Sequence, residues 1–221
     1  MKTALVSLCY LDGLDVLGND RLERNKRYLR YYLGLQDEFG FDEILLLDNA
    51  SSAEATASLL AEYPQIDIFR FLNHLPRKPI VHGYPYCWRG LYHYAELMKE
   101  YDKIIYIDSD GFVLTKRLAH YIRNLKSGWT TFLAQTQNFP EAALHILCPD
   151  AYPILLKYFE VPWQTRVGTL METSLPFTHV ETKFKCGRYG ERFHEDRNQH
   201  PSQDYYGQAP LNIPLTFEMG K

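Results

Sequence analysis

Short apolar runs that end in a carboxylate constrain the fold of this chain most strongly. Glu43–Asp48 (EILLLD) and Lys103–Asp108 (KIIYID) each hold four consecutive apolar residues between charged ends. A strand with one solvent-facing side alternates apolar and polar residues, whereas an unbroken apolar run indicates a strand buried on both faces. Such strands are typical of a parallel sheet that is covered by helices.

Helical patterns alternate with apolar strands along most of the chain. Helices are expected from Asn19 or Asp20 to about Phe39, and at Ser52–Tyr63, Trp88–Met98, Thr115–Leu125 and Ala151–Phe159. Further strands are expected at Ala4–Tyr10, Ile66–Phe71, Thr131–Gln135, Ala143–Leu147 and Phe177–Lys185, with irregular chain after Gly187. Ser51 and Glu54 form a capping box for the second helix. The pattern predicts an α/β fold with a mostly parallel central sheet and helices on both faces.

Composition narrows the class of protein. The 221 residues suit a single α/β domain, and 46% hydrophobic with 23% charged residues is ordinary for a globular chain. A net charge of −3 argues against nucleic-acid binding. No apolar run approaches the length of a transmembrane segment. Four widely spaced cysteines without a CxxC pair are expected to be reduced, so we expect a cytoplasmic protein.

The acidic triplet Asp108-Ser109-Asp110 follows the apolar strand directly. Ligands of open α/β sheets gather at the carboxyl ends of the strands. Two carboxylates one residue apart at such an end suit Mg²⁺ or Mn²⁺ that is shared with a diphosphate. The alternative is a polar turn that ends a strand and caps the next helix.

Two segments resemble a known family. Tyr101–Asp110 (YDKIIYIDSD) resembles the metal-binding DxD segment of GT-A glycosyltransferases, and Leu45–Ser52 (LLLDNASS) is similar to their second-strand signature. The resemblance covers residues 3 to about 135. It implies one GT-A-like domain over 1–221, with a nucleotide-sugar-binding half to about residue 135 and an acceptor-side half over 136–221.

The resemblance also implies an activity, which is metal-dependent transfer of a sugar from a UDP- or GDP-sugar. The acceptor is an unidentified glycan, lipid-linked or small molecule. Carried over to this sequence, the backbone at Cys9 and Tyr10 would line the base pocket, and Asp48 would contact the uracil or ribose. Asp108 lies near the ribose or metal, and Asp110 binds Mn²⁺ or Mg²⁺.

Other site residues are weaker expectations from the second half of the chain. We expect His200 to be a third metal ligand, rather than His179 or His194, because His200-Pro201 resembles an HP segment of some GT-A families. Glu172 resembles the acidic residue that inverting members place before a proline-bounded segment. It is our first candidate for the catalytic base, and Glu181 is the second. Glu195 and Asp196 remain alternatives.

A loop rich in proline, glycine and histidine precedes the fourth strand. Asn73–Pro85 is long for a compact domain, and such loops often border a functional site. Arg89 follows it near a helix start, where a cation can reach a diphosphate leaving group. A basic group near the acceptor side suits an acidic acceptor or a solvated face: Lys183, Lys185, Arg188 and Arg192.

Three other functions share parts of these patterns. A phosphatase of the haloacid-dehalogenase type has a similar motif to Ile107–Thr115, with Asp108 as nucleophile and Asp110 as acid/base, but Phe112 stands where that family has threonine. A nucleotidyltransferase needs a glycine-rich loop with an arginine after the first strand, and Cys9–Gly13 does not supply one. An inactive carbohydrate-binding relative is the third alternative.

Overall fold

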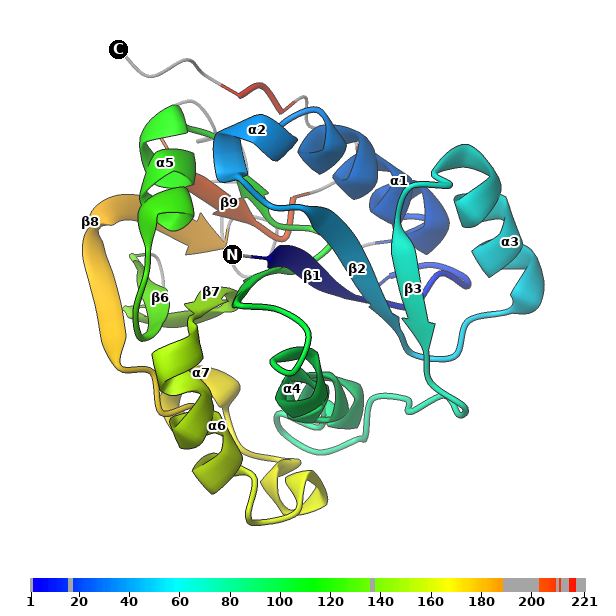
Figure 1. The fold of residues 1–221 in the computed structure, drawn as a ribbon. Coiled ribbons are helices and arrows are strands. Elements are labelled where there is room, and N and C mark those ends of the chain that lie inside the picture. The colour runs from blue at the N-terminus through cyan, green and yellow to red at the C-terminus, as the bar shows by residue number, and fades with distance from the viewer. Residues whose placement is uncertain are drawn as a thin grey trace.

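The computed structural model describes residues 2–15, 18–135, 138–188, 203–209, 211 and 215–217 (Figure 1). Its strands are β1 Thr3–Cys9, β2 Glu43–Asp48, β3 Asp67–Arg70, β4 Lys103–Ile107, β5 Phe112–Val113, β6 Trp129–Ala134, β7 Phe139–Leu147, β8 His179–Arg188 and β9 Tyr205–Gly207. Its helices are α1 Arg21–Leu33, α2 Gln36–Phe39, α3 Ala53–Glu62, α4 Pro85–Leu97, α5 Lys116–Asn124, α6 Tyr152–Tyr158 and α7 Met171–Ser174, with 3-10 turns η1 Pro149–Ala151 and η2 Trp163–Arg166.

All of these strands belong to one sheet of order β3-β2-β1-β4-β7-β6-β8-β9-β5. Neighbours pair in parallel at β3/β2, β2/β1, β1/β4, β6/β8 and β8/β9. The antiparallel pairs are β4/β7, β7/β6 and β9/β5. The sheet is therefore mostly parallel, as the apolar runs predict.

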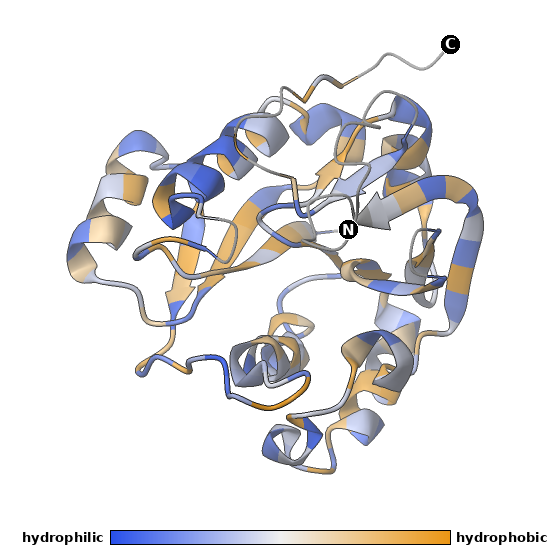
Figure 2. Ribbon diagram, turned by 180° about the vertical axis from the view of Figure 1, so that it is seen from behind, coloured by the Kyte–Doolittle hydropathy of each residue, from blue (hydrophilic) through white to orange (hydrophobic). Residues whose placement is uncertain are grey.

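Helices cover the sheet on both faces and create two hydrophobic cores (Figure 1). One core contains residues of α1, α2, α3 and α5, and the other contains residues of α4 and α6. Strand β1 contributes Leu5 to the first core and Ala4 and Val6 to the second. Figure 2 shows hydrophobic residues along the central strands. The predicted fold class is confirmed.

Local differences from the predicted elements have clear physical causes. The helix expected from Asn19 or Asp20 to Phe39 is divided at Gly34 into α1 and α2, and Gly40 ends α2 with a φ of 64°. The cap of α3 is Ser52, whose hydroxyl accepts from the N–H of Ala55, and not Ser51. Ser51 is instead engaged by Asp48, so the expected capping box is wrong.

Two short strands were not expected. Strand β5 has two residues and β9 has three, too few for a recognisable alternation. They pair with each other through Phe112↔Tyr206 and Val113↔Tyr205. This pairing brings chain from beyond residue 200 back beside the segment that follows Asp110.

The four cysteines are free thiols, and three of them are buried. None of the helices in the described part of the chain combines the length and hydrophobicity needed to cross a membrane.

The second core contains a buried histidine. The ring of His145 stacks on Tyr106 at 4.8 Å between centroids and contacts Trp129 and Phe177. Its Nδ1 lies 2.8 Å from the carbonyl oxygen of Ala142. Burial lowers the pKa of His145 to about 4, against a smaller rise from that hydrogen bond.

This histidine makes stability depend on pH. The unfolded chain protonates His145 near pH 6.5 and the folded chain only near 4, so the unfolded state binds more protons between these values. Stability from this group is present above pH 6.5 and is lost as the pH falls towards 4, by about 3 kcal/mol in total. Equilibrium urea unfolding of the wild type and His145→Phe at several pH values should show a flatter profile for the variant. The exposed-residue control His120→Gln should keep the wild-type slope, and equal slopes for wild type and His145→Phe would contradict the assignment.

Candidate functional site

The order of the strands in the sheet reverses next to β1. After β1 the chain adds β2 and then β3 on one side, and it then returns to add β4 on the other side of β1. In open α/β sheets, ligands bind outside the carboxyl ends of the strands where the strand order reverses in this way. The residues at the carboxyl ends of β1, β2 and β4 include Cys9, Tyr10, Asp48, Asp108 and Asp110.

Asp48 is fully buried and braces the turn after β2. Its carboxylate accepts from the backbone N–H of Ser51 at 3.0 Å, from the Ser51 hydroxyl, and from the Cys9 thiol at 3.7 Å. Burial, then the charge of Asp48, raises the pKa of Cys9, so this thiol stays protonated as a donor. Ser51 also accepts from the N–H of Leu11, which ties the ends of β1 and β2 together. Asp48 thus supports the ends of β1 and β2 through buried hydrogen bonds.

Asp108 is fixed by hydrogen bonds of its side chain and of its backbone. The hydroxyl of Tyr106, two residues earlier, donates to Asp108 Oδ1. The backbone N–H of Asp108 donates to the carbonyl of Ala143 on β7, and its carbonyl accepts from Gly111 at 2.8 Å. The carboxylate is partly exposed, and the Tyr106 hydroxyl orients it, as hydrogen-bond partners commonly orient carboxylates that bind metals.

Asp110 lies beside a cation from α1. Its Oδ2 is 3.8 Å from Arg24 Nη1, which also contacts Asp15 at 3.1 Å. The side chain of Asp110 is 26% exposed and that of Arg24 is 17% exposed. Arg24 was not anticipated from the sequence, because only folding brings α1 beside the carboxyl end of β4.

Tyrosines of α1 hold the segment that follows Asp110. Tyr31 donates to the carbonyl of Val113 at 2.6 Å, and Tyr32 donates to the carbonyl of Gly111 at 3.1 Å. A Cβ on Gly111 would lie 2.3 Å from the hydroxyl oxygen of Tyr205, so glycine is needed there. The position of Asp110 therefore depends on two distant segments.

A buried carboxylate of β7 acts on the same tyrosine as Asp108 and Asp110 do. Glu141 of β7 is fully buried and accepts from the N–H of Ala143 at 2.9 Å. Burial, followed by the charges of Glu141, Asp108 and Asp110, raises the pKa of Tyr205. Glu141 was missed because its place after the expected turn at Asn138–Pro140 suggests a solvated residue.

Tyr10 presents a half-buried ring at the end of β1. The ring of His74 lies against it, with 4.2 Å between centroids, and the guanidinium of Arg21 lies 5.4 Å from its centroid. Aromatic and cationic groups of this kind stack on flat heteroaromatic rings. His74 belongs to the 73–85 loop, whose first residues therefore lie at the carboxyl end of β1.

Asn49 and Arg89 tie this loop to the sheet. The side chain of Asn49 donates to the carbonyl of Leu75 at 3.0 Å and accepts from its N–H at 3.1 Å. Arg89 donates through Nη2 to Asn49 at 2.6 Å and through Nη1 to the Asn73 carbonyl at 2.8 Å. Its guanidinium also lies 4.0 Å from the centroid of Phe71. These contacts give Arg89 a role in positioning the loop.

Glu181 is held by Lys183 of its own strand and by Tyr121. Burial alone would raise its pKa, but the N–H of Lys183, the hydroxyl of Tyr121 and the Lys183 ammonium together lower the pKa to about 2. Tyr121 belongs to α5 and Glu181 pairs with Phe132 of β6. A carboxylate with so low a pKa is a weak base, so we leave Glu181 out of the site.

Glu172 is buried on α7, which packs against β7, the neighbour of β4. His179 is exposed and lies 3.8 Å from Glu181. His194, Glu195, Asp196 and His200 lie outside the described residues, as does Arg192 of the basic group.

The carboxylates of the described residues fit a metal ion that is also bound by substrate phosphates better than one enclosed by protein ligands alone. No group of three or more histidines, cysteines or acidic residues that could hold a metal occurs among the described residues. Mg²⁺ is commonly bound by one or two carboxylates together with substrate phosphates and water. Asp108 and Asp110 provide such a pair of hard oxygen donors.

No protein-family model and no curated protein sequence matches the chain. Solved structures that match include a cytidylyltransferase from Leptospira borgpetersenii (11% identity, 82% of this chain and 75% of that chain, TM-score 0.49). A glycosyltransferase involved in glycosylation of the major capsid of PBCV-1 also matches (11%, 82% and 81%, 0.43). So does a mannosyltransferase from Pyrobaculum calidifontis in complex with GDP-mannose and Mn²⁺ (10%, 70% and 46%, 0.42). At these identities and TM-scores, nothing about the chemistry of this chain follows from the likenesses.

Arg89→Lys tests the assignment of Arg89 to the loop. Lysine keeps the charge but cannot reach Asn49 and Asn73 with separate nitrogens, so the loop loses at least one hydrogen bond. We expect roughly tenfold faster hydrogen exchange at the Leu75 amide, since a bond of this kind contributes about 1 kcal/mol or more. Arg77→Lys, in the same loop, is the control and should leave that amide unchanged. Unaltered exchange in Arg89→Lys would disprove the role.

Proposed function

We propose that this chain is a metal-dependent glycosyltransferase that uses a UDP- or GDP-sugar. The observation that carries the proposal is the position of Asp108 and Asp110. They follow β4 at the strand reversal, and the half-buried ring of Tyr10 lies at the end of the neighbouring strand β1. A nucleotide diphosphate spans the distance between a stacking surface for its base and a charged group for its phosphates. In this proposal the first half of the chain, to about residue 135, binds the donor, and the remainder faces the acceptor.

The reaction is substitution at the anomeric carbon of the donor sugar. The bond from that carbon to the diphosphate oxygen breaks, a bond to the acceptor oxygen forms, and the acceptor hydroxyl proton passes to a base. Asp108 and Asp110 would hold Mn²⁺ or Mg²⁺, which when bound neutralises the negative charge that develops on the departing diphosphate.

The residues of the chain prepare the site for this charge. Tyr106 fixes one oxygen of Asp108, which leaves the carboxylate in a defined orientation. Arg24 adds a cation beside Asp110, within reach of a phosphate bound there. Tyr10 stacks on the base, with His74 and Arg21 at its ring. Asp48 supports this surface through Ser51 and Cys9.

Glu172 is the proposed base. It is buried on a helix that packs against β7, next to the strand that ends at Asp108. A base must accept a proton from the acceptor hydroxyl, and a carboxylate shielded from bulk water is suited to that role.

No observation favours the phosphatase alternative. The position that holds threonine in that family is Phe112, which is 1% exposed. Its ring is stacked with Tyr32 at 6.2 Å between centroids. A core phenylalanine supplies no hydroxyl to a phosphate.

Asp110→Asn tests the metal-binding role. A neutral amide is a poorer ligand for a hard cation, so Mn²⁺-supported binding of the donor should weaken at least about tenfold. Calorimetry with UDP- and GDP-sugars, with Mn²⁺ and with a chelator, measures the effect. Asp37→Asn, an exposed carboxylate on α2, is the matched control.

The same preparations separate the two chemistries. Wild-type protein should release UDP or GDP from a donor with Mn²⁺ and should not turn over an aryl phosphate. Aryl-phosphate hydrolysis that is lost in Asp108→Asn, with no release of UDP or GDP, would contradict the proposal in favour of a phosphatase.

Glu172→Gln tests the base. Loss of a general base lowers turnover by about 10²-fold to 10⁴-fold while leaving donor affinity unchanged. Metal-dependent hydrolysis of the donor, in which water is the acceptor, provides the rate, and calorimetry provides the affinity. Full turnover in Glu172→Gln would remove Glu172 from the mechanism.

A further inference from the structure

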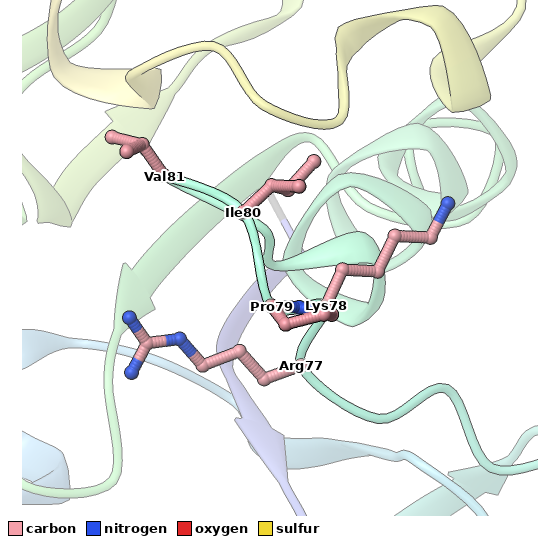
Figure 3. Close-up of a pocket in the computed structure, with 5 residues that line it drawn as sticks. All are labelled: Arg77, Lys78, Pro79, Ile80 and Val81. Carbon is pink, nitrogen blue, oxygen red and sulfur yellow. The ribbon is translucent and has the colours of Figure 1, made fainter.

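The 73–85 loop contains an exposed segment with two basic and two aliphatic side chains. We name residues 76–81 (Pro76, Arg77, Lys78, Pro79, Ile80 and Val81) the basic–apolar segment, and all six are exposed. Ile80 is 50% exposed, Val81 is 75% exposed, and nearby Leu72 is fully exposed. Figure 3 shows Arg77 and Lys78 extending away from each other, with Ile80 and Val81 beyond them along the loop.

The charge of this region is opposite in sign to that of the whole chain. The chain has a net charge of −3, yet no Asp or Glu occurs between Asp67 and Glu96. Within the described residues, neither Arg77 nor Lys78 forms an ion pair, and the guanidinium of Arg77 lies 4.9 Å from the centroid of the Tyr84 ring. The segment therefore presents uncompensated positive charge.

The fold holds this segment away from the core. Lys78 N–H donates to the Gly83 carbonyl at 2.7 Å, and Gly83 N–H donates to the Ile80 carbonyl at 3.1 Å. A Cβ at Gly83 would lie 2.5 Å from the Lys78 carbonyl oxygen, so the tight turn needs glycine. Gly168 N–H donates to the His82 carbonyl at 3.3 Å and fixes the turn from outside. Ile80 and Val81 are thus kept exposed by a closed turn.

Other exposed apolar side chains lie on neighbouring elements. Of the nine large hydrophobic side chains exposed in the described part of the chain, two belong to this loop, and Leu72 directly precedes it. Four more lie on β3, α4 and the α6–η2 region: Phe69, Tyr92, Leu156 and Val161. Only Leu14 and Leu60 lie elsewhere.

We propose that the basic–apolar segment docks the protein reversibly onto an anionic phospholipid bilayer. Arg77 and Lys78 would contact headgroup phosphates, and Ile80 and Val81 would enter the interface between headgroups and acyl chains. The positive charge complements such a surface. Protruding aliphatic side chains enter a bilayer without the matching groove that a protein partner must provide.

Docking has a consequence for the candidate site, and this consequence rests on the proposed function. Leu75 of the same loop is hydrogen-bonded to Asn49, which directly follows Asp48. A membrane bound to the segment would lie near the carboxyl ends of β1 and β2. A lipid-linked acceptor would then be presented to the site from the membrane.

Vesicle co-sedimentation of the full chain tests the proposal without reference to activity. We expect binding to vesicles of equimolar phosphatidylcholine and phosphatidylglycerol, and little binding to phosphatidylcholine alone. Arg77→Ala/Lys78→Ala should weaken binding about 30-fold, since each basic residue near an anionic surface contributes about fivefold. Ile80→Ser/Val81→Ser should weaken it by roughly tenfold or more. Matched controls are Arg30→Ala/Lys99→Ala and Leu60→Ser, exposed residues outside the segment, which should bind as the wild type does.

Several results would overturn the proposal. These are absence of binding, equal binding to neutral vesicles, or wild-type binding by both segment variants with unchanged thermal unfolding. Displacement by free glycerol phosphate would indicate a small phosphate site. A dimer in sedimentation that Ile80→Ser/Val81→Ser dissociates would assign the segment to a second copy. Binding to polyglutamate without binding to vesicles would assign it to an acidic protein partner.

Discussion

Strand β1 is buried on both faces between two parallel neighbours, and this arrangement decides where charged groups can lie. Ala4, Leu5 and Val6 are fully buried, with helices packed against both sides of the sheet. An isolated charge in this interior would carry a large desolvation cost, so charged side chains are confined to the strand ends. Parallel pairing places the carboxyl ends of β1, β2 and β4 at one edge. The acidic groups of the candidate site are consequently gathered by the fold itself.

The opposite end of β4 illustrates the same constraint. Lys103 begins the strand, is 1% exposed, and donates through Nζ to the carbonyls of Ile122 and Arg123 at the end of α5. Burial lowers its pKa to about 8. Its ammonium thus satisfies carbonyls at a helix C-terminus, while Asp108 at the other end accepts from Tyr106. The short apolar strand β4 therefore has a structural cation, Lys103, at its start and a candidate ligand-binding carboxylate, Asp108, directly after its end.

The strands with continuous apolar runs were predictable from sequence because every residue between their charged ends is apolar, as burial on both faces requires. The expected bounds Glu43–Asp48 are those of β2, and β4 differs from its expectation by one residue. Contacts between distant segments were not predictable, because no sequence pattern indicates them. The contact of Arg24 with Asp110 and the hydrogen bond from Arg89 to Asn49 depend on how separate elements pack together. The choice between Ser51 and Ser52 as a cap was decided by Asp48, which engages Ser51.

The proposed function requires that Asp108 and Asp110 hold a divalent metal against the diphosphate of a nucleotide that stacks at Tyr10. Crystals grown with Mn²⁺ and UDP or GDP test it most directly, because anomalous scattering locates manganese without reference to an expected ligand. We expect one manganese peak in contact with the carboxylate of Asp110 and with nucleotide phosphate oxygens, and a base against the ring of Tyr10. Nucleotide bound with its phosphates away from Asp108 and Asp110, or manganese at another place on the chain, would contradict it.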